Sequence, residues 1–111
     1  MNGPHLIIIS WRDIPAQVTA RHGRKRASIE LHPRFQRAID RAAVLAGKHT
    51  ADDYVAEWRR QATQCGADLA AEVERAAGRL DAEFTPPVLG RYVTNGGHRP
   101  EGSPQIEGAH R

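Results

Sequence analysis

The hydrophobic pattern of this chain changes from strand-like to helical near residue 32, and that change constrains the fold most. Leu6 to Trp11 (LIIISW) is a short apolar, β-branched run typical of a buried strand. Apolar residues then alternate with polar ones over 17–22 and again over 26–31. The turn between these two segments contains Gly23, which tolerates positive φ. The pattern predicts three strands, which we expect to be antiparallel.

Two helices are predicted next. Pro33 stands at a first helical position, and Gly47 supplies a C-cap. Thr50-Ala51-Asp52-Asp53 is close to a capping box, so a second helix is expected to include Trp58 and to end before Gly66. Apolar residues recur at helical spacing in both segments, namely Phe35, Ala38, Ile39, Ala42 and Ala46, then Tyr54, Val55, Trp58 and Ala62.

A third helix is predicted from the cap residue Asp68 to the Pro86-Pro87 pair. Strands followed by helices indicate an α+β fold, with a three-stranded antiparallel sheet and two or three helices in a single domain over 5–85. Residues 86–111 hold four prolines and five glycines and few apolar side chains. We therefore expect a disordered tail there, with at most a short extended segment over 88–93.

Composition narrows the class of protein. The chain has 111 residues, enough for one small domain, and 40% of them are hydrophobic. The longest run of large apolar residues, Leu6 to Ile9, is four residues, far below the roughly 20 of a membrane span. The single cysteine, Cys65, excludes a disulfide framework, and the N-terminus lacks the pattern of a signal peptide. We expect a cytoplasmic protein.

Charge is unevenly distributed. Residues 1–41 carry eight basic and three acidic side chains, whereas residues 68–83 carry two basic and five acidic ones. Such a chain can present one face to a polyanion or to an acidic partner. A simply solvated surface is the alternative.

Residues 11–17 form the most unusual segment (WRDIPAQ). An aromatic, a bidentate cation and a proline at a strand break are residue types favoured at interfaces. A partner-binding surface would consist of Trp11, Arg12, Asp13, Pro15 and Gln17. In the alternative interpretation Trp11 belongs to the core, Asp13 caps the turn and Arg12 neutralises it.

A basic surface is the second candidate. Arg34, Arg37 and Arg41 lie on one stripe of the first predicted helix. With Arg24, Lys25 and Arg26 of the hairpin they are a candidate footprint for phosphate. The alternative is a solvated helix face that Asp40 partly neutralises.

No pattern in the sequence indicates catalysis. The six histidines lack metal-ligand spacing, and no phosphate-binding, dinucleotide or hydrolase motif occurs. Cys65 has no adjacent cysteine and is interpreted as a spectator thiol. We expect no metal, no cofactor and no enzymatic activity of the chain's own.

Four segments nevertheless resemble a small bacterial family, the virulence-factor domain. They are Ile9 to Val18 (ISWRDIPAQV), Gly23 to Arg26 (GRKR), Phe35 to Ala43 and Tyr54 to Arg60, and the similarity covers about residues 6–61. The resemblance brings no catalytic residues. It implies a stand-alone accessory protein in one-carbon metabolism, alongside folate-dependent reductases and corrinoid methyltransferases.

A second resemblance, over residues 26–60, is to ribbon-helix-helix units of antitoxins and repressors. It implies a strand that pairs with its twin and reads DNA with Arg26, Ser28 and Glu30. Two predicted strands precede this one, and pairing with them would occupy the edge that the twin needs.

From these observations we expect a non-catalytic adaptor that docks a partner enzyme through residues 11–17 and the nearby basic surface. A ribbon-helix-helix transcriptional regulator is the alternative, with nucleic acid as its partner. An enzyme subunit that contributes one Arg or Asp to a shared site is a third possibility.

Overall fold

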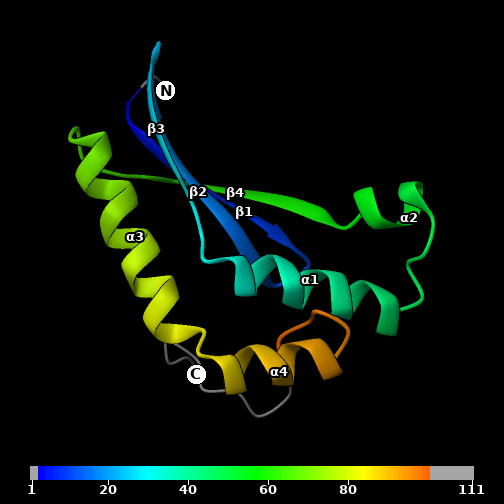
Figure 1. Ribbon diagram of the computed structural model, residues 1–111. Helices are drawn as coiled ribbons and strands as arrows, with labels where there is room; N and C mark the ends of the chain where they lie inside the picture. Colours follow the sequence, from blue (N-terminus) through cyan, green and yellow to red (C-terminus); the bar gives the residue numbers. More distant parts are fainter. Residues whose placement is uncertain (1–2, 101–111) are drawn as a thin grey trace, which may run out of the picture.

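The computed structural model describes residues 3–100 and shows an α+β fold (Figure 1). Its sheet is antiparallel and has four strands in the order β3-β2-β1-β4. The strands are β1 (His5–Trp11), β2 (Ile14–His22), β3 (Lys25–Glu30) and β4 (Trp58–Gln64). The helices are α1 (Pro33–Leu45), α2 (Ala51–Val55), α3 (Leu69–Glu83) and α4 (Pro86–Thr94).

Helices cover one face and one end of the sheet. α3 crosses the face that bears Leu6 and Val18, and its own Val73 and Ala76 join them in the core. α1 and α4 pack together across the end of the sheet (Figure 1). The opposite face of the sheet carries Ile7 and the other strand side chains that alternate with Leu6 and Val18. No described helix is long and apolar enough to cross a membrane.

The predicted strands 6–11, 17–22 and 26–31 are confirmed, but the second strand begins earlier, at Ile14. Pro15 does not interrupt it. The β1–β2 register shifts between Ile9 and Ser10, and Pro15 lies opposite Ser10 at this bulge. A bulge is one of the few places in a sheet where proline is tolerated.

The prediction of a second helix through Trp58 and Ala62 is wrong. α2 ends at Val55, and residues 58–64 form β4 beside β1. The apolar run of β1 sits inside the sheet, where its backbone groups need hydrogen-bond partners on both edges. β4 pairs with the second edge of β1, although it lies about 55 residues farther along the chain. No local pattern in the sequence predicts this pairing.

The prediction of a disordered tail is also wrong for its first part. Pro86 and Pro87 occupy the first turn of α4, where proline fits because those N–H groups have no helical partner. Leu89, Tyr92 and Val93 follow at helical spacing and are buried, so no extended segment forms over 88–93. The folded part therefore passes residue 85. Residues 101–111 of the expected tail lie outside the described residues.

The structure differs from a ribbon-helix-helix unit at two points. β3 pairs with β2 of its own chain, and α2 has only five residues. The long second helix that such a unit requires is replaced by β4.

Candidate binding groove

Trp11 belongs to the core, so the expectation that it offers an exposed aromatic surface is wrong. Its side chain is 0% exposed. The ring stacks on Tyr54 with a centroid separation of 5.8 Å, and Nε1 donates to the Tyr54 carbonyl at 2.8 Å. Trp11 therefore anchors α2 to the sheet, which leaves it unavailable for direct contact with a partner.

Arg12 has a structural role as well. It begins the two-residue turn between β1 and β2 with a φ of 52°, a conformation that favours glycine. Its Nε donates to Glu57 at 3.1 Å, its Nη1 donates to the Gly96 carbonyl at 2.9 Å, and the guanidinium lies over the Trp11 ring. Its ion-pair partner is Glu57, so it does not neutralise Asp13 as the sequence suggested.

The hydrogen bond from Arg12 lowers the pKa of Glu57. Partial desolvation raises this pKa, but the charges of Arg12 and Lys48 lower it further, and the net effect is a lowered pKa. An unfolded Glu57 takes up its proton first as the pH falls. The stability contributed by this pair is thus fully present at neutral pH and is lost as the pH falls through the depressed folded-state pKa. Chemical denaturation between pH 7 and pH 3 should show a shallower loss of stability for Glu57→Gln than for the wild type. Equal slopes for the two proteins would contradict the assignment.

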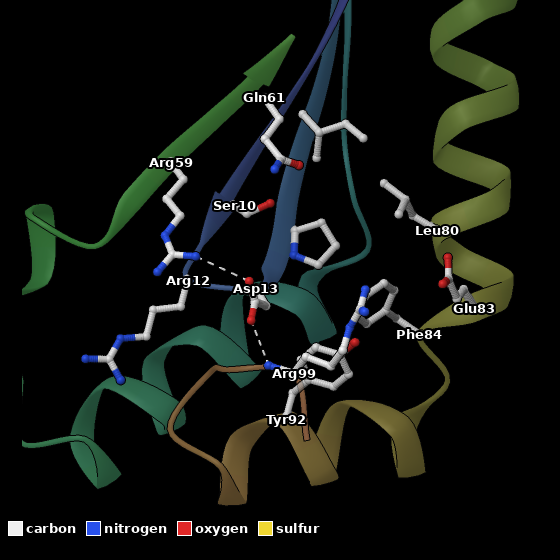
Figure 2. Close-up of a pocket in the computed structure, with 12 residues that line it drawn as sticks. Ser10, Arg12, Asp13, Arg59, Gln61, Leu80, Glu83, Phe84, Tyr92 and Arg99 are labelled. Atoms are coloured by element: carbon white, nitrogen blue, oxygen red, sulfur yellow. Dashed lines mark hydrogen bonds and ion pairs between the residues drawn. The ribbon is translucent and has the colours of Figure 1, made fainter. Parts of the chain in front are cut away.

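Asp13 joins the turn to two distant segments. Its Oδ1 accepts from Arg59 of β4 at 3.3 Å, and its Oδ2 accepts from the backbone N–H of Arg99 at 2.7 Å (Figure 2). His98 Nδ1 lies 3.9 Å from the same oxygen. The carboxylate thereby fixes the relative positions of β4 and the chain after α4.

These contacts form one end of a groove between α3 and β4, hereafter the α3–β4 groove, with a volume of about 480 Å³. The β-sheet wall is polar and consists of Ser10, Asp13, Arg59 and Gln61. The rest of the lining is largely apolar. Ile8 and Pro15 contribute to it from the sheet, and Leu80, Phe84 and Tyr92 form the helical wall, with Glu83 and Arg99 as polar members. Arg12 borders the groove, but its guanidinium points away from it (Figure 2).

The lining is suited to recognition through hydrogen bonds and apolar contact. None of the described residues that line the groove is His, Cys or Lys. Ser10 thus has no histidine or lysine in the lining to act as its base. A guanidinium, an amide and a hydroxyl opposite an aromatic wall instead provide hydrogen-bond donors beside an apolar surface.

The groove divides the candidate segment 11–17. Asp13 and Pro15 line it, whereas Gln17 faces the other side of the sheet, in a second hollow bordered by Gln36 and Trp58. Arg59 and Gln61 are not among the predicted site residues, because the sequence pattern predicts a helix there and positive charge near a helix C-terminus is favoured without any ligand. Phe84 lies in the third predicted helix and was not among the candidates, and Tyr92 lies in the expected tail.

The predicted basic surface is not a single patch. The β2–β3 turn with Arg24, Lys25 and Arg26 lies at the opposite end of the sheet from α1 (Figure 1). Arg34 has a structural role, because its guanidinium donates to the Phe84 carbonyl at 2.9 Å and forms an ion pair with Asp81 at 3.1 Å. Arg37 and Arg41 remain exposed on α1.

Neither a metal site nor a reactive thiol appears among residues 3–100. No three His, Cys, Asp or Glu side chains there could hold a metal ion. Burial raises the pKa of the Cys65 thiol, and the charge of Glu72 adds to the effect. A thiol with a raised pKa is a poor nucleophile at neutral pH.

Comparison with known families gives one match that covers most of the chain. The model of the family described as virulence factor matches residues 9–92, from β1 through α4. The chain belongs to the virulence factor family. The match includes residues of both walls of the α3–β4 groove, whereas the lining residues Ile8 and Arg99 lie outside it. No curated protein and no solved structure matches the chain.

Proposed function

We propose that this virulence factor family protein is a non-catalytic accessory protein that docks a partner protein through the α3–β4 groove. The observation that carries the proposal is the composition of the lining, which combines an apolar helical wall with a guanidinium and an amide and contains no histidine, cysteine or lysine. Such a surface can hold a side chain and a neighbouring charge of another protein.

The lining also specifies the chemistry of the docking segment. Leu80 and Phe84 provide contact area for an apolar or aromatic side chain. Arg59 is 49% exposed, and its contact with Asp13 uses one nitrogen only. Because arginine has five N–H donors, its others are directed to an acidic side chain of the partner.

The class of partner comes from the family resemblance alone, which implies a folate- or corrinoid-dependent enzyme of one-carbon methyl transfer. From the lining of the groove we further infer that the docking segment of this partner contains an acidic residue and an apolar residue. Enzymes of this class are therefore the first partners to test by direct titration.

Neighbouring arginines on β4 offer a matched test. Arg59 pairs in register with Ser10 and lines the groove, whereas Arg60 pairs with Ile9 and faces the other side of the sheet. Affinity capture from cells that produce the protein should recover a partner with the wild type and with Arg60→Glu. Arg59→Glu should weaken that partner's binding at least about tenfold in a subsequent calorimetric titration, as expected for an interfacial arginine.

Both variants carry the same charge change on an exposed strand, but only Arg59→Glu also loses the exposed ion pair with Asp13. Exposed ion pairs contribute little to stability, so circular dichroism should show both variants to be folded. Equal binding by Arg59→Glu and the wild type would remove the groove from the interaction. Equal loss with both variants would indicate a nonspecific charge effect and would also overturn the proposal.

A further inference from the structure

The outer edge of β4 has no strand beside it among residues 3–100. Two backbone hydrogen bonds fix which groups face it, from the N–H of Arg12 to the Glu57 carbonyl and from the N–H of Cys65 to the Pro4 carbonyl. In an antiparallel pair the residues bonded to the neighbour alternate. Residues 59, 61 and 63 therefore bond to β1, and the even-numbered residues of β4 direct their N–H and C=O groups outward. Within the described part of the chain, β4 has no strand partner other than β1.

The residues of β4 match a second copy of themselves. When Trp58–Gln64 pairs antiparallel over its full length with the same strand, Gln61 lies opposite Gln61. Arg60 of one copy then lies opposite Ala62 of the other. Because the backbone N–H and C=O groups of both residues point away from β1, each residue can form backbone hydrogen bonds with the other. Arg59 lies opposite Thr63, and no arginine faces an arginine, which cross-strand pairing would penalise.

We propose that β4 pairs with β4 of a second copy of this chain about a two-fold axis at Gln61, forming one continuous eight-stranded sheet. This symmetric contact satisfies the outward backbone groups of both copies. Side chains of β4 from Arg59 to Gln64 are all exposed in the single chain, so the edge is accessible. The inference does not depend on the proposed docking function.

Pairing would also extend the α3–β4 groove. Arg59, Gln61 and Thr63 share the groove-side face of the sheet, because they pair with Ser10, Ile8 and Leu6. The second copy would place its Thr63 beside Arg59 and its Gln61 at the axis. The two grooves of the dimer would then be adjacent on the same face and would share one polar border.

Proline substitution at one position distinguishes this edge from other contacts. The N–H of Ala62 points outward, so Ala62→Pro removes a donor for the second copy and leaves the pairing with β1. Sedimentation should show a dimer that forms with rising concentration for the wild type and for Ala62→Val, and a monomer for Ala62→Pro. A wild type that stays monomeric at all concentrations overturns the proposal, as does a dimer that survives in folded Ala62→Pro.

Charge at Thr63 tests the register without proline. Thr63→Glu would face Arg59 of the second copy and tighten the dimer, whereas Thr63→Arg would loosen it. Two symmetric pairs change the dissociation constant roughly two- to thirty-fold in each direction. Both variants lose the same β-branched residue at an exposed position, so they are matched for their effect on the monomer. Equal dissociation constants for the two variants would contradict the register.

A disulfide provides a direct readout of the axis. Residues that face each other in a pair without mutual hydrogen bonds have Cα atoms about 4.5 Å apart, within disulfide range. In a Cys65→Ala background, Gln61→Cys should therefore cross-link on mild oxidation. Arg60→Cys should not, because its own counterpart lies farther along the strand. Cross-linking at position 60 and not at 61 would overturn the pairing.

Discussion

Trp11→Ala is expected to lower the free energy of unfolding by about 3–5 kcal/mol, the range for truncating a buried aromatic residue. Trp11 is fully buried, and the substitution would remove the stacking on Tyr54, the hydrogen bond to the Tyr54 carbonyl and the surface under Arg12. A small domain has a total stability of about 5–15 kcal/mol, so a large fraction would be lost. Denaturant titration monitored by circular dichroism measures the change.

Two further substitutions divide the contribution of Trp11. Trp11→Phe keeps an aromatic ring and loses the hydrogen bond, so its effect should be clearly smaller than that of alanine. Trp58→Ala truncates a partly exposed indole that meets Tyr54 edge-on, and it should also cost less. A loss below about 1 kcal/mol for Trp11→Ala would mean that the segment is not anchored as described.

Gly97→Ala should be the most damaging of the glycine substitutions, with a loss of about 2–4 kcal/mol from backbone strain and overpacking together. Gly97 has a φ of 93°, and an added Cβ would lie 2.9 Å from Cζ3 of Trp11. The ring is held by Tyr54 and cannot withdraw without breaking that contact. Thermal unfolding should show a lowered melting temperature.

Gly23→Ala is the matched control for this effect. Gly23 also has a positive φ, of 63°, but nothing lies within 4 Å of the added Cβ. Its cost should be the conformational one alone, roughly 1–2 kcal/mol. Equal losses at positions 23 and 97 would show that the close approach to Trp11 contributes nothing.

Local sequence patterns were sufficient to predict the strands and helices whose own apolar residues are buried in the core. Alternation predicted β3 and the end of β2, and Pro33 with Gly47 marked α1 within two residues of its observed bounds. The cap at Asp68 is confirmed, since its carboxylate accepts from the Ala71 N–H. In each case the sequence signal and the tertiary structure agree.

β4 was missed because its stability comes from pairing with β1, and its apolar residues Trp58 and Ala62 lie four residues apart, a spacing that also fits a helix. Thr50 does start a helix, as its capping hydrogen bond to the Asp53 N–H shows, but that helix stops after five residues. α4 was missed for a related reason. Its two prolines and one glycine suggested disorder, although Leu89, Tyr92 and Val93 already had helical spacing.

The candidate site could be predicted only in part. The composition of residues 11–17 marked an unusual segment, and its Asp13 and Pro15 line the groove. Which residues of the segment are buried depends on α2 and on the chain after α4, which meet it from more than 40 residues away. The opposite wall of the groove comes from α3 and α4, so only the tertiary structure reveals the cavity.

The contacts of the β1–β2 turn with Gly96 and Arg99 span 84 and 86 residues of sequence. During synthesis on the ribosome, Trp11 and Arg12 emerge long before the glycines that cover them. The nascent chain must therefore keep a large aromatic side chain partly uncovered until nearly the whole described segment has left the exit tunnel. Contacts of such long range also favour slow folding for a chain of this size. A nascent chain halted near residue 85 would remain exposed to aggregation and to chaperone capture.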